Sequence, residues 1–487
     1  MNNQASLQTL LIKARKFHND SSFKEAITLY NLILSKVNHS QNPGVLLLAG
    51  QAYYEIKDYE TALSYVNKSL KFLNNADTYN TLSQILVKLK RYSEAEESLK
   101  IAIKIDPNNP ILCNSLGVVY SKLKQEKLAQ EYYRKGIKIN PKLEVLYFNL
   151  AKSHTRRKEY KFAINFYNKV IEINPDFYDA YWNKSLVLLK LGNFEEGWEL
   201  YNFRKLAPYV KNLVGNLEEV KWRKFDQLSG KSLLIRAEQG FGDSIQFIRF
   251  LFLFQYSNCH ITFQVQPQLI PLFKNINFNC DVDLISLSNT PKEYDYRCYL
   301  LTLPSLFKTS IQDLPIKENY ICPDSQKRLT WFSKIKSKKM NIGFAISGSQ
   351  TKRNSETRDI SYLNFQDCMS SKFNWHSLHK EYKESDFQFM EFKKNIFNHQ
   401  DLLTDFSETA ALIDSLDLVI TVDTAVAHLA GALGVETWVM LEFNNDFRWL
   451  EEKDFSPWYQ SIKLYRQTTS GSWDNVIREI KGDLERI

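Results

Sequence analysis

The first part of the chain shows a helical pattern of apolar positions that repeats at a fixed step. Small residues and prolines mark the period, and each proline follows its alanine by twelve positions. The alanines are Ala95, Ala129 and Ala163, and the prolines are Pro107, Pro141 and Pro175. A small side chain lets two helices approach closely, and a proline ends the second helix. The pattern therefore predicts stacked pairs of antiparallel helices.

The step between successive marker residues is 34, and Ala26 and Ala62 extend the series with slightly different spacing. A helix–turn–helix period of this length is the signature of tetratricopeptide repeats. Stacked repeats bury a continuous core and expose a concave groove. We predict a repeat array over residues 1–206, closed by a partial repeat that ends near Arg204, and a protein or peptide as the groove's ligand.

From about Val220 onward the pattern changes to short β-prone runs that alternate with helical stretches. The runs cover residues 231–237, 259–265, 340–347, 416–422 and 435–441. Strands that alternate with helices predict parallel α/β sheets. We predict two Rossmann-like domains, 215–325 and 326–487, that face each other. A ligand is then expected in the cleft beyond the carboxyl ends of the strands.

Composition narrows the class of protein. Hydrophobic residues make up 44% of the chain, which is ample for packed cores. The net charge of +8 comes from the repeat region, whose basic surface either attracts an acidic partner or is simply solvated. The six cysteines lack zinc spacing, and no signal peptide or transmembrane segment is evident. We therefore expect a cytoplasmic protein without a metal site and without a nucleic-acid partner.

The run "EQGFGD" forms a polar, glycine-spaced elbow after the first β-prone run. Gly240 and Gly242 permit close approach of a ligand, and Gln239 lies beside them. Asp243 has two interpretations: it caps a helix in a box with Gln246, or it is a carboxylate general base at the cleft. The elbow lacks the third glycine of the dinucleotide fingerprint, which disfavours a nicotinamide-dependent dehydrogenase.

A second candidate site follows the run 416–422. Asp423 and Thr424 open a helix that is expected to stop at Gly434, and a helix start of this kind suits a diphosphate. His428 lies on the same helix face as Thr424. It either donates a hydrogen bond to a phosphate or sugar hydroxyl, or it is a satisfied core histidine.

A third candidate site is the loop after the run 340–347. Lys352, Arg353 and Arg358 supply cations that could neutralise a leaving diphosphate. The alternative is an ordinary solvated, charged loop.

These stretches together carry a family resemblance. The motifs are "AEQGFGDSIQFIRF", "DFSETAALIDSLDLVITVDTAVAHLAGALGVETWVML", "FRWL" and "SPWYQSIKLYRQ". The chain resembles bacterial tetratricopeptide-repeat proteins whose second half is similar to family 9 glycosyltransferases, the heptosyltransferase-like group. The resemblance implies a GT-B pair of Rossmann-like domains and transfer of a sugar from a nucleotide-sugar donor. It implies inversion at the sugar, no essential metal, no cofactor beyond the nucleotide sugar, and a protein or glycan acceptor.

The resemblance also implies roles for residues of this chain. Asp243 falls on the carboxylate that activates the acceptor hydroxyl. Asp423, Thr424, Ala425 and His428 fall on the donor-binding turn, and Arg358 falls on the basic residue of the phosphate-side loop. Gln239, Gly240, Gly242 and Lys352 are placed near the phosphate or the acceptor.

Three departures from the family pattern lie on the donor side. In the loop, Ser355 stands where the family has an acid and Asp359 where it has a serine. Ile346 replaces the tryptophan before the loop, and His379 stands where the family has a glutamine. The alternative to an active transferase is a non-catalytic repeat scaffold whose glycosyltransferase-like domain is degenerate.

Overall fold

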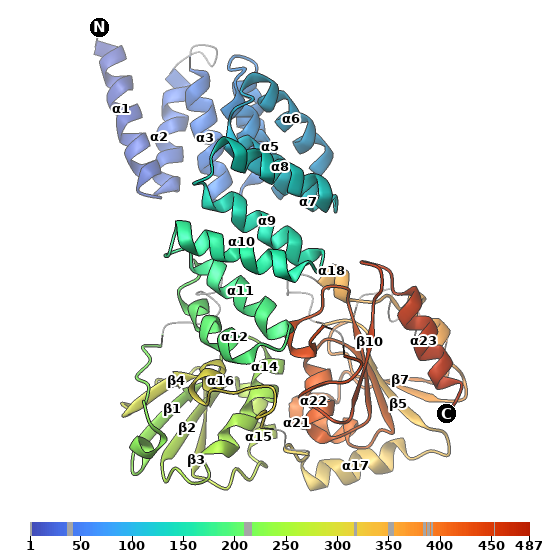
Figure 1. Cartoon of the computed structure of the whole chain (residues 1–487). Helices are drawn as coiled ribbons and strands as arrows, with labels where there is room; N and C mark the ends of the chain where they lie inside the picture. The colour runs from blue at the N-terminus through green and yellow to red at the C-terminus, as the bar shows by residue number, and fades with distance from the viewer. Residues whose placement is uncertain are drawn as a thin grey trace. The chain divides into compact units, whose positions relative to one another are not determined.

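The structure is a computed structural model. It describes residues 2–36, 42–208, 217–315, 319–348, 355–382, 386, 390, 393–451 and 453–487. The chain divides into two compact units, Met1–Ala180 and Tyr181–Ile487 (Figure 1). The division falls in the first turn of the last helical pair, which begins at Tyr178, whereas the sequence placed the end of the array at residue 206. The divisions at 215–325 and 326–487 stay predictions.

The first unit consists of paired helices, as the period predicts (Figure 1). Their bounds are α1 Asn2–Asn19, α2 Phe23–Lys36, α3 Pro43–Glu55, α4 Tyr59–Leu70, α5 Ala76–Lys88, α6 Tyr92–Ile105, α7 Pro110–Lys122, α8 Glu126–Ile139, α9 Glu144–Arg156 and α10 Tyr160–Ile173. The marker alanines Ala95, Ala129 and Ala163 are fully buried. The superhelical repeat array is therefore confirmed.

Close helix contact explains a glycine within one of these pairs. A Cβ at Gly117 on α7 would lie 2.7 Å from Cδ1 of Tyr133 on α8, so only a glycine leaves room for the tyrosine ring. Tyr133 is itself buried. The large residue on one helix thus fills the space that the small residue on the other leaves open, which is the packing that the period predicted.

The second unit opens with a helical pair and continues into two sheets. The pair is α11 Tyr178–Lys190 and α12 Phe194–Tyr201, followed by the 3-10 turn η2 Asn202–Lys205. The strands of the first sheet are β1 Ser232–Arg236, β2 His260–Val265, β3 Val282–Ser286 and β4 Tyr296–Tyr299. They pair in parallel in the order β3-β2-β1-β4.

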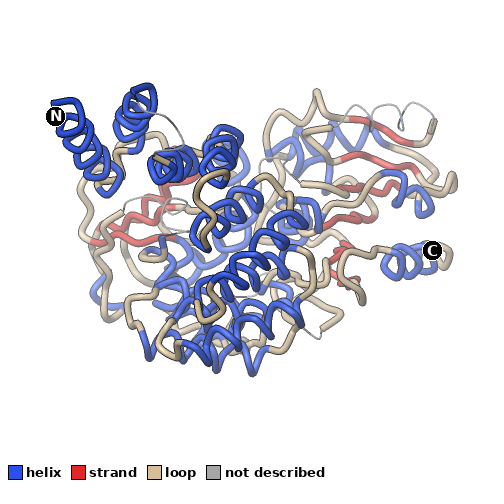
Figure 2. Tube along the Cα trace, turned by 90° about the horizontal axis from the view of Figure 1, so that it is seen from above, coloured by secondary structure: helices blue, strands red, loops and turns tan. Residues whose placement is uncertain are grey.

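The second sheet is larger and is also parallel. Its strands are β5 Asn341–Ala345, β6 Asn374–Ser377, β7 Ile396–Asn398, β8 Leu418–Val422, β9 Thr437–Leu441 and β10 Ile462–Arg466. Their order is β10-β9-β8-β5-β6-β7. Figure 2 shows the strands gathered in these two separate sheets. The prediction of parallel α/β layers is confirmed.

Helices and turns connect the strands of the two sheets. In the first they are η3 Phe225–Leu228, α14 Phe241–Phe247, η4 Ile248–Phe254, η5 Pro267–Leu269, α15 Ile270–Phe273, η6 Leu300–Thr302 and α16 Leu303–Leu306. In the second they are α17 Ser325–Ile335, α18 Ser355–Arg358, α19 Tyr362–Phe365, η7 Gln366–Cys368, α21 Phe406–Ile413, α22 Ala425–Leu433, η8 Phe447–Trp449 and α23 Asp474–Leu484.

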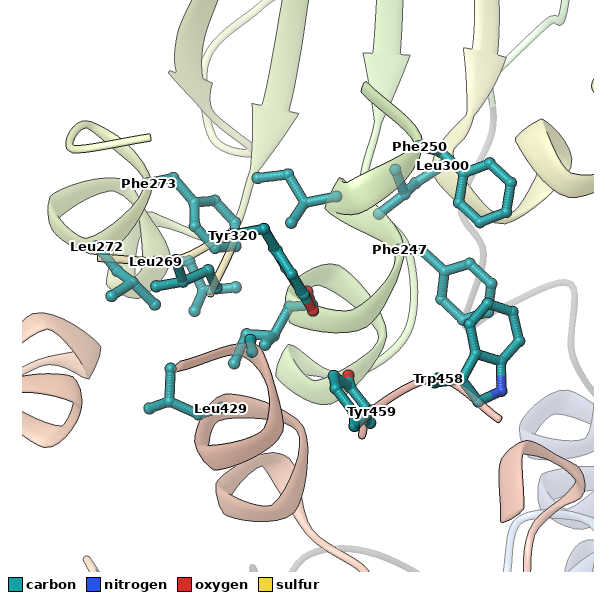
Figure 3. Close-up of a cluster of buried hydrophobic side chains, with 14 of the residues drawn as sticks. Phe247, Phe250, Leu269, Leu272, Phe273, Leu300, Tyr320, Leu429, Trp458 and Tyr459 are labelled. Atoms are coloured by element: carbon teal, nitrogen blue, oxygen red, sulfur yellow. The ribbon is translucent and has the colours of Figure 1, made fainter. Parts of the chain in front are cut away.

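A shared hydrophobic core joins the elements around the two sheets. Figure 3 shows Phe247 beside Trp458, with Phe250 next to Phe247, and it places Tyr459 and Leu429 of α22 in the same buried cluster. The ring centroids of Phe247 and Trp458 are 5.5 Å apart. The structure therefore packs helix α14 against helix α22. Among the described helices, none is long and apolar enough to cross a membrane.

Candidate functional site

Both sheets reverse their direction of winding at one point, and the candidate residues follow the strands there. In the first sheet the reversal lies between β1 and β4, and the elbow follows β1. In the second sheet it lies between β5 and β8, and Asp423 follows β8. Crevices at such switch points, beyond the carboxyl ends of the strands, are where open α/β sheets bind ligands.

A buried ion pair between Arg204 and Glu238 stabilises the start of the elbow. Glu238 accepts a hydrogen bond from Arg204 Nε at 2.9 Å and another from the Leu301 backbone N–H at 3.2 Å. The Arg204 and Glu238 side chains are both fully buried. Arg204 belongs to η2, which directly follows the last helical pair. The Arg204–Glu238 contact therefore connects that helical segment to the elbow.

The next residue of the elbow adopts an unusual backbone conformation. Gln239 has a φ of 60°, in the left-handed region that non-glycine residues seldom adopt. Its side-chain amide donates to the hydroxyl of Tyr201 on α12 at 3.1 Å. The sharp turn that carries the chain from β1 into α14 is thus fixed by two residues of the preceding helical segment, Tyr201 and Arg204.

Asp243 is the third residue of α14 and not its cap. The cap is Gly240, and Asp243 Oδ2 accepts its backbone N–H at 2.8 Å. The capping box with Gln246 is wrong, because the helix starts three residues earlier than the "DSIQ" pattern suggests. The Gln246 amide is instead buried and has no hydrogen-bond partner among the described residues.

Gly242 brings the elbow directly against the start of α22. A Cβ at this position would lie 2.8 Å from Cδ2 of His428 and 3.6 Å from Cα of Ala425. A larger residue would push the two helices apart. The structure thus places the elbow beside two of the predicted donor-binding residues.

The second candidate turn has the predicted form. Thr424 caps α22 by accepting the Val426 N–H at 3.3 Å, and Gly434 ends the helix with a φ of 73°. Asp423 is half-buried beside this cap. Burial and, secondarily, the nearby Asp446 carboxylate raise the pKa of Asp423 to about 7, against the opposing effect of Arg448 and Arg358.

His428 has a packed environment. Its Nδ1 lies 3.2 Å from the hydroxyl of Tyr459, and its ring stacks on Trp449 with centroids 5.2 Å apart. The side chain is buried. The structure therefore gives His428 the contacts of a core histidine, while Gly242 lies close to the edge of its ring.

Arg358 is the last residue of α18, and its guanidinium lies against Gly348, which follows β5. Its guanidinium pairs with Asp359 at 3.1 Å, and Asp359 also accepts the Gly348 N–H at 3.2 Å. The Arg358 charge lowers the pKa of both Asp423 and Glu442, although burial raises both. Arg358 and Asp423 therefore share one charged region. Lys352, predicted beside them, lies outside the described residues.

One departure from the family pattern has a structural explanation. Nε2 of His379 accepts the backbone N–H groups of Ile346 and Ser347, at 3.0 and 3.2 Å. Its Nδ1 faces Ser377 Oγ at 2.9 Å. Because Nε2 accepts, the proton of the neutral ring is on Nδ1 and donates to Ser377. His379 thus holds the base of the loop that leads to Arg358.

Arg448 is the residue of this site to which the sequence assigned no role. It lies on η8, and its guanidinium pairs with Asp243 and, at 2.7 Å, with Asp446. Burial opposes its charge, but these two carboxylates outweigh that effect and raise the pKa of Arg448. Its partner Asp243 is distant in sequence, so no local pattern reveals the pair. The only signal was the "FRWL" motif.

Comparisons with known proteins separate the chain into the same two parts. Residues 19–102 match the profile described as anaphase-promoting complex, cyclosome, subunit 3. Residues 111–143 and 145–177 match tetratricopeptide repeats. Residues 402–438 match glycosyltransferase family 9 (heptosyltransferase). The chain contains tetratricopeptide repeats and a segment similar to family 9 glycosyltransferases. That segment contains α21, β8 and α22, and hence Asp423, Thr424, Ala425 and His428.

Two curated proteins are similar in sequence. Protein FlbA of Caulobacter vibrioides is 24% identical over 335 residues, which cover 61% of this chain and 53% of FlbA. Sperm-associated antigen 1 of Mus musculus is 41% identical over 59 residues, which cover 12% of this chain and 6% of the antigen. The chain thus spans about half the length of FlbA and a small part of the antigen.

Solved structures resemble part of the chain. A fragment of MamA from Desulfovibrio magneticus is 22% identical, covers 35% of this chain and 95% of its own, and has a TM-score of 0.31. PilW, a type IV pilus biogenesis factor, is 16% identical, covers 42% of this chain and 97% of its own, and has a TM-score of 0.39.

Proposed function

We propose that this protein is a glycosyltransferase that moves a sugar from a nucleotide-sugar donor to a hydroxyl acceptor. The two sheets with their helices would form a GT-B pair of Rossmann-like domains, and the repeat array would recruit a protein or glycan acceptor or another protein partner. The observation that carries the proposal is the meeting of the elbow with the start of α22: Gly242 contacts His428, and Asp243 pairs with Arg448.

The proposed reaction is a direct displacement at the sugar. Asp243 takes the proton of the acceptor hydroxyl, whose oxygen then bonds to the anomeric carbon. The bond from that carbon to the diphosphate oxygen breaks, and the nucleoside diphosphate leaves from the opposite face. The capped start of α22 and the cation Arg358 stabilise the charge that develops on the leaving group. Asp423, half-buried and with a raised pKa, is suited to a hydrogen bond with a sugar hydroxyl.

Binding of donors by the full-length protein tests the proposal first. We expect UDP-, GDP- or ADP-linked sugars to raise the melting temperature, with a clear preference for one nucleotide. Thr424→Ala should weaken that shift, because it removes the cap of α22. The matched control is Asp401→Asn, which changes an exposed residue in the turn after β7 of the second sheet. If none of these sugars shifts the melting temperature, the proposal fails.

Turnover distinguishes an enzyme from a scaffold. Asp243→Asn should keep donor binding and reduce the release of nucleoside diphosphate at least about 100-fold, the usual contribution of a general base. A non-catalytic scaffold is favoured by one observation, the ion pair that engages Asp243 with Arg448. That alternative predicts no release of nucleoside diphosphate by the unaltered protein with any acceptor preparation.

A further inference from the structure

Arg448 has a hydrogen-bonding edge that is only half used. Its Nη1 donates to Asp446 Oδ1 at 2.7 Å, and its Nη2 pairs with Asp243 Oδ1. Its Nε is buried and has no hydrogen-bond partner among the described residues. Nε and Nη2 form the side edge of the guanidinium, which fits two oxygens of one anion. Asp243 supplies one oxygen to this edge and turns the other to the Gly240 N–H.

The guanidinium is held in a fixed orientation. Its carbon lies 4.4 Å from the ring centroid of Phe447 and 5.7 Å from that of Phe247. Only 7% of Arg448 is exposed. A side chain packed in this way loses little freedom when it changes partners, so an incoming anion can take over the edge without rearranging the residue.

The site surrounding Arg448 is also placed for an anion. Burial raises the pKa of Asp423, the residue that precedes the capped start of α22, and the positive charges of Arg448 and Arg358 both lower it. Both arginines therefore exert their charge in the region where α22 begins. Guanidinium groups and a helix start are donors typical of a diphosphate site.

We propose that Arg448 binds the diphosphate of the nucleotide donor, and that the diphosphate displaces Asp243 from the guanidinium. Donor binding then frees the carboxylate that accepts the acceptor's proton. Asp243 and the diphosphate thus compete for one edge of Arg448. This inference rests on the proposed function, and it adds an order of events, since the base is released only when a donor is present.

Calorimetric titration of the full-length protein with UDP, GDP and ADP tests the competition. Asp243→Asn removes the competing charge, so it should tighten the diphosphate that binds best by roughly three- to tenfold. Arg448→Met should weaken the same diphosphate by roughly 10- to 100-fold, the range for a lost charge-assisted hydrogen bond. The corresponding nucleoside monophosphate should respond less to both changes.

Controls make the outcomes distinct. Arg478→Met changes an exposed arginine on α23 and should leave the affinity unchanged. Arg448→Lys, which keeps the charge but loses the planar edge, replaces Arg448→Met if the latter does not fold. Unchanged or weaker binding by Asp243→Asn overturns the competition, as does unchanged binding by the Arg448 variant. Absence of binding by the unaltered protein overturns the proposed function itself.

Discussion

At the scale of single residues, Asp243 uses its two carboxylate oxygens in different ways. Oδ2 accepts the Gly240 N–H and so stabilises the start of α14, while Oδ1 faces Arg448 on the second sheet's side. The helix-terminus role and the proposed catalytic role are therefore compatible. The first fixes the carboxylate relative to the elbow, and the second requires that fixed position.

The environment of His379 determines the protonation state of its ring. It is buried, and burial lowers the pKa of its ring to about 4. Protonation would place a hydrogen on Nε2, which accepts the N–H groups of Ile346 and Ser347 in the folded protein. The base of the loop that leads to Arg358 thus depends on a neutral imidazole.

Acid should therefore destabilise the second unit in part through His379. The folded pKa lies below the unfolded value of 6.5, so the contribution is complete above pH 6.5 and is lost as the pH falls toward 4. The loss should reach roughly 2–3 kcal/mol by pH 4.5. Urea unfolding at pH 7 and pH 4.5 measures it.

Two variants of His379 separate protonation from packing. His379→Gln keeps an acceptor that does not titrate, so it should match the unaltered protein at pH 7 and resist acid better. His379→Leu removes the acceptor and should be less stable at both values of pH. An equal loss of stability on acidification in the unaltered protein and in His379→Gln would show that His379 is not responsible.

At the scale of elements, the helical pair α11–α12 and the turn η2 belong with the sheets. Trp198 on α12 contacts Phe247 and Phe447, with ring centroids 5.6 and 5.7 Å apart. Arg204 on η2 completes the buried pair with Glu238. A segment that reads as the end of the repeat array therefore supports the elbow and contacts residues beside both sheets.

Removing one partner of the buried Arg204–Glu238 ion pair should strongly destabilise the fold. Arg204→Met leaves the Glu238 carboxylate buried and uncompensated, and we expect the free energy of unfolding to fall by about 3–5 kcal/mol. The double variant Arg204→Met with Glu238→Gln should recover part of that loss, because no charge remains buried. Urea unfolding of the three proteins gives the comparison.

A matched exposed pair provides the control for this comparison. Lys231 and Asp295 lie 3.3 Å apart, and their side chains are 48% and 40% exposed. Lys231→Met should change the free energy of unfolding by about 1 kcal/mol or less. If Arg204→Met has an equally small effect, the pair does not support the elbow.

The sequence predicted the elements that bury continuous apolar runs. The strands β1, β2, β5, β8 and β9 lie within predicted runs, and the repeat helices follow the alanine and proline period. The strands β3, β4, β6, β7 and β10 were missed. Several of these are short, half-buried or mixed in polarity, such as "NWHS" in β6 and the three-residue β7. A local pattern does not distinguish such a strand from a loop.

The candidate site shows the same limit. Asp243, Asp423 and Thr424 follow buried strands and open helices, so local patterns identified them. Arg448 contributes through its contact with Asp243, which only the fold brings near. The sequence could not anticipate that ion pair. It misplaced the start of α14 because the cap is Gly240, which has no side chain to signal a cap.

At the scale of the whole molecule, the division by contacts differs from the division by sequence period. The period continues to about Arg204, but the compact units separate at Ala180 and Tyr181. The physical reason lies in the side chains of α12. Phe194 packs against Trp458, and Trp198 against Phe247 and Phe447. The sequence period predicts which helices pair with each other. It does not predict which hydrophobic core the other faces of those helices pack against.

Two fragments of the second unit test which boundary is physical. A fragment of residues 178–487 keeps α11, α12 and η2, whereas a fragment of residues 207–487 lacks Trp198 and Arg204. The shorter fragment exposes the rings that Trp198 covers and leaves Glu238 buried without its cation, so we expect it to be less stable by more than about 5 kcal/mol. Urea unfolding followed by tryptophan fluorescence measures the difference.

The longer fragment should unfold cooperatively and bind the same nucleotide as the full-length protein, because every residue of the proposed site lies within it. Trp198→Ala in the full-length chain is the matched variant if the shorter fragment aggregates, and it should cost about 3–5 kcal/mol. Equal stability of the two fragments would assign the last helical pair to the repeat array. The elbow would then hold its shape without Tyr201 and Arg204, and the positive φ of Gln239 would need support from the first sheet alone.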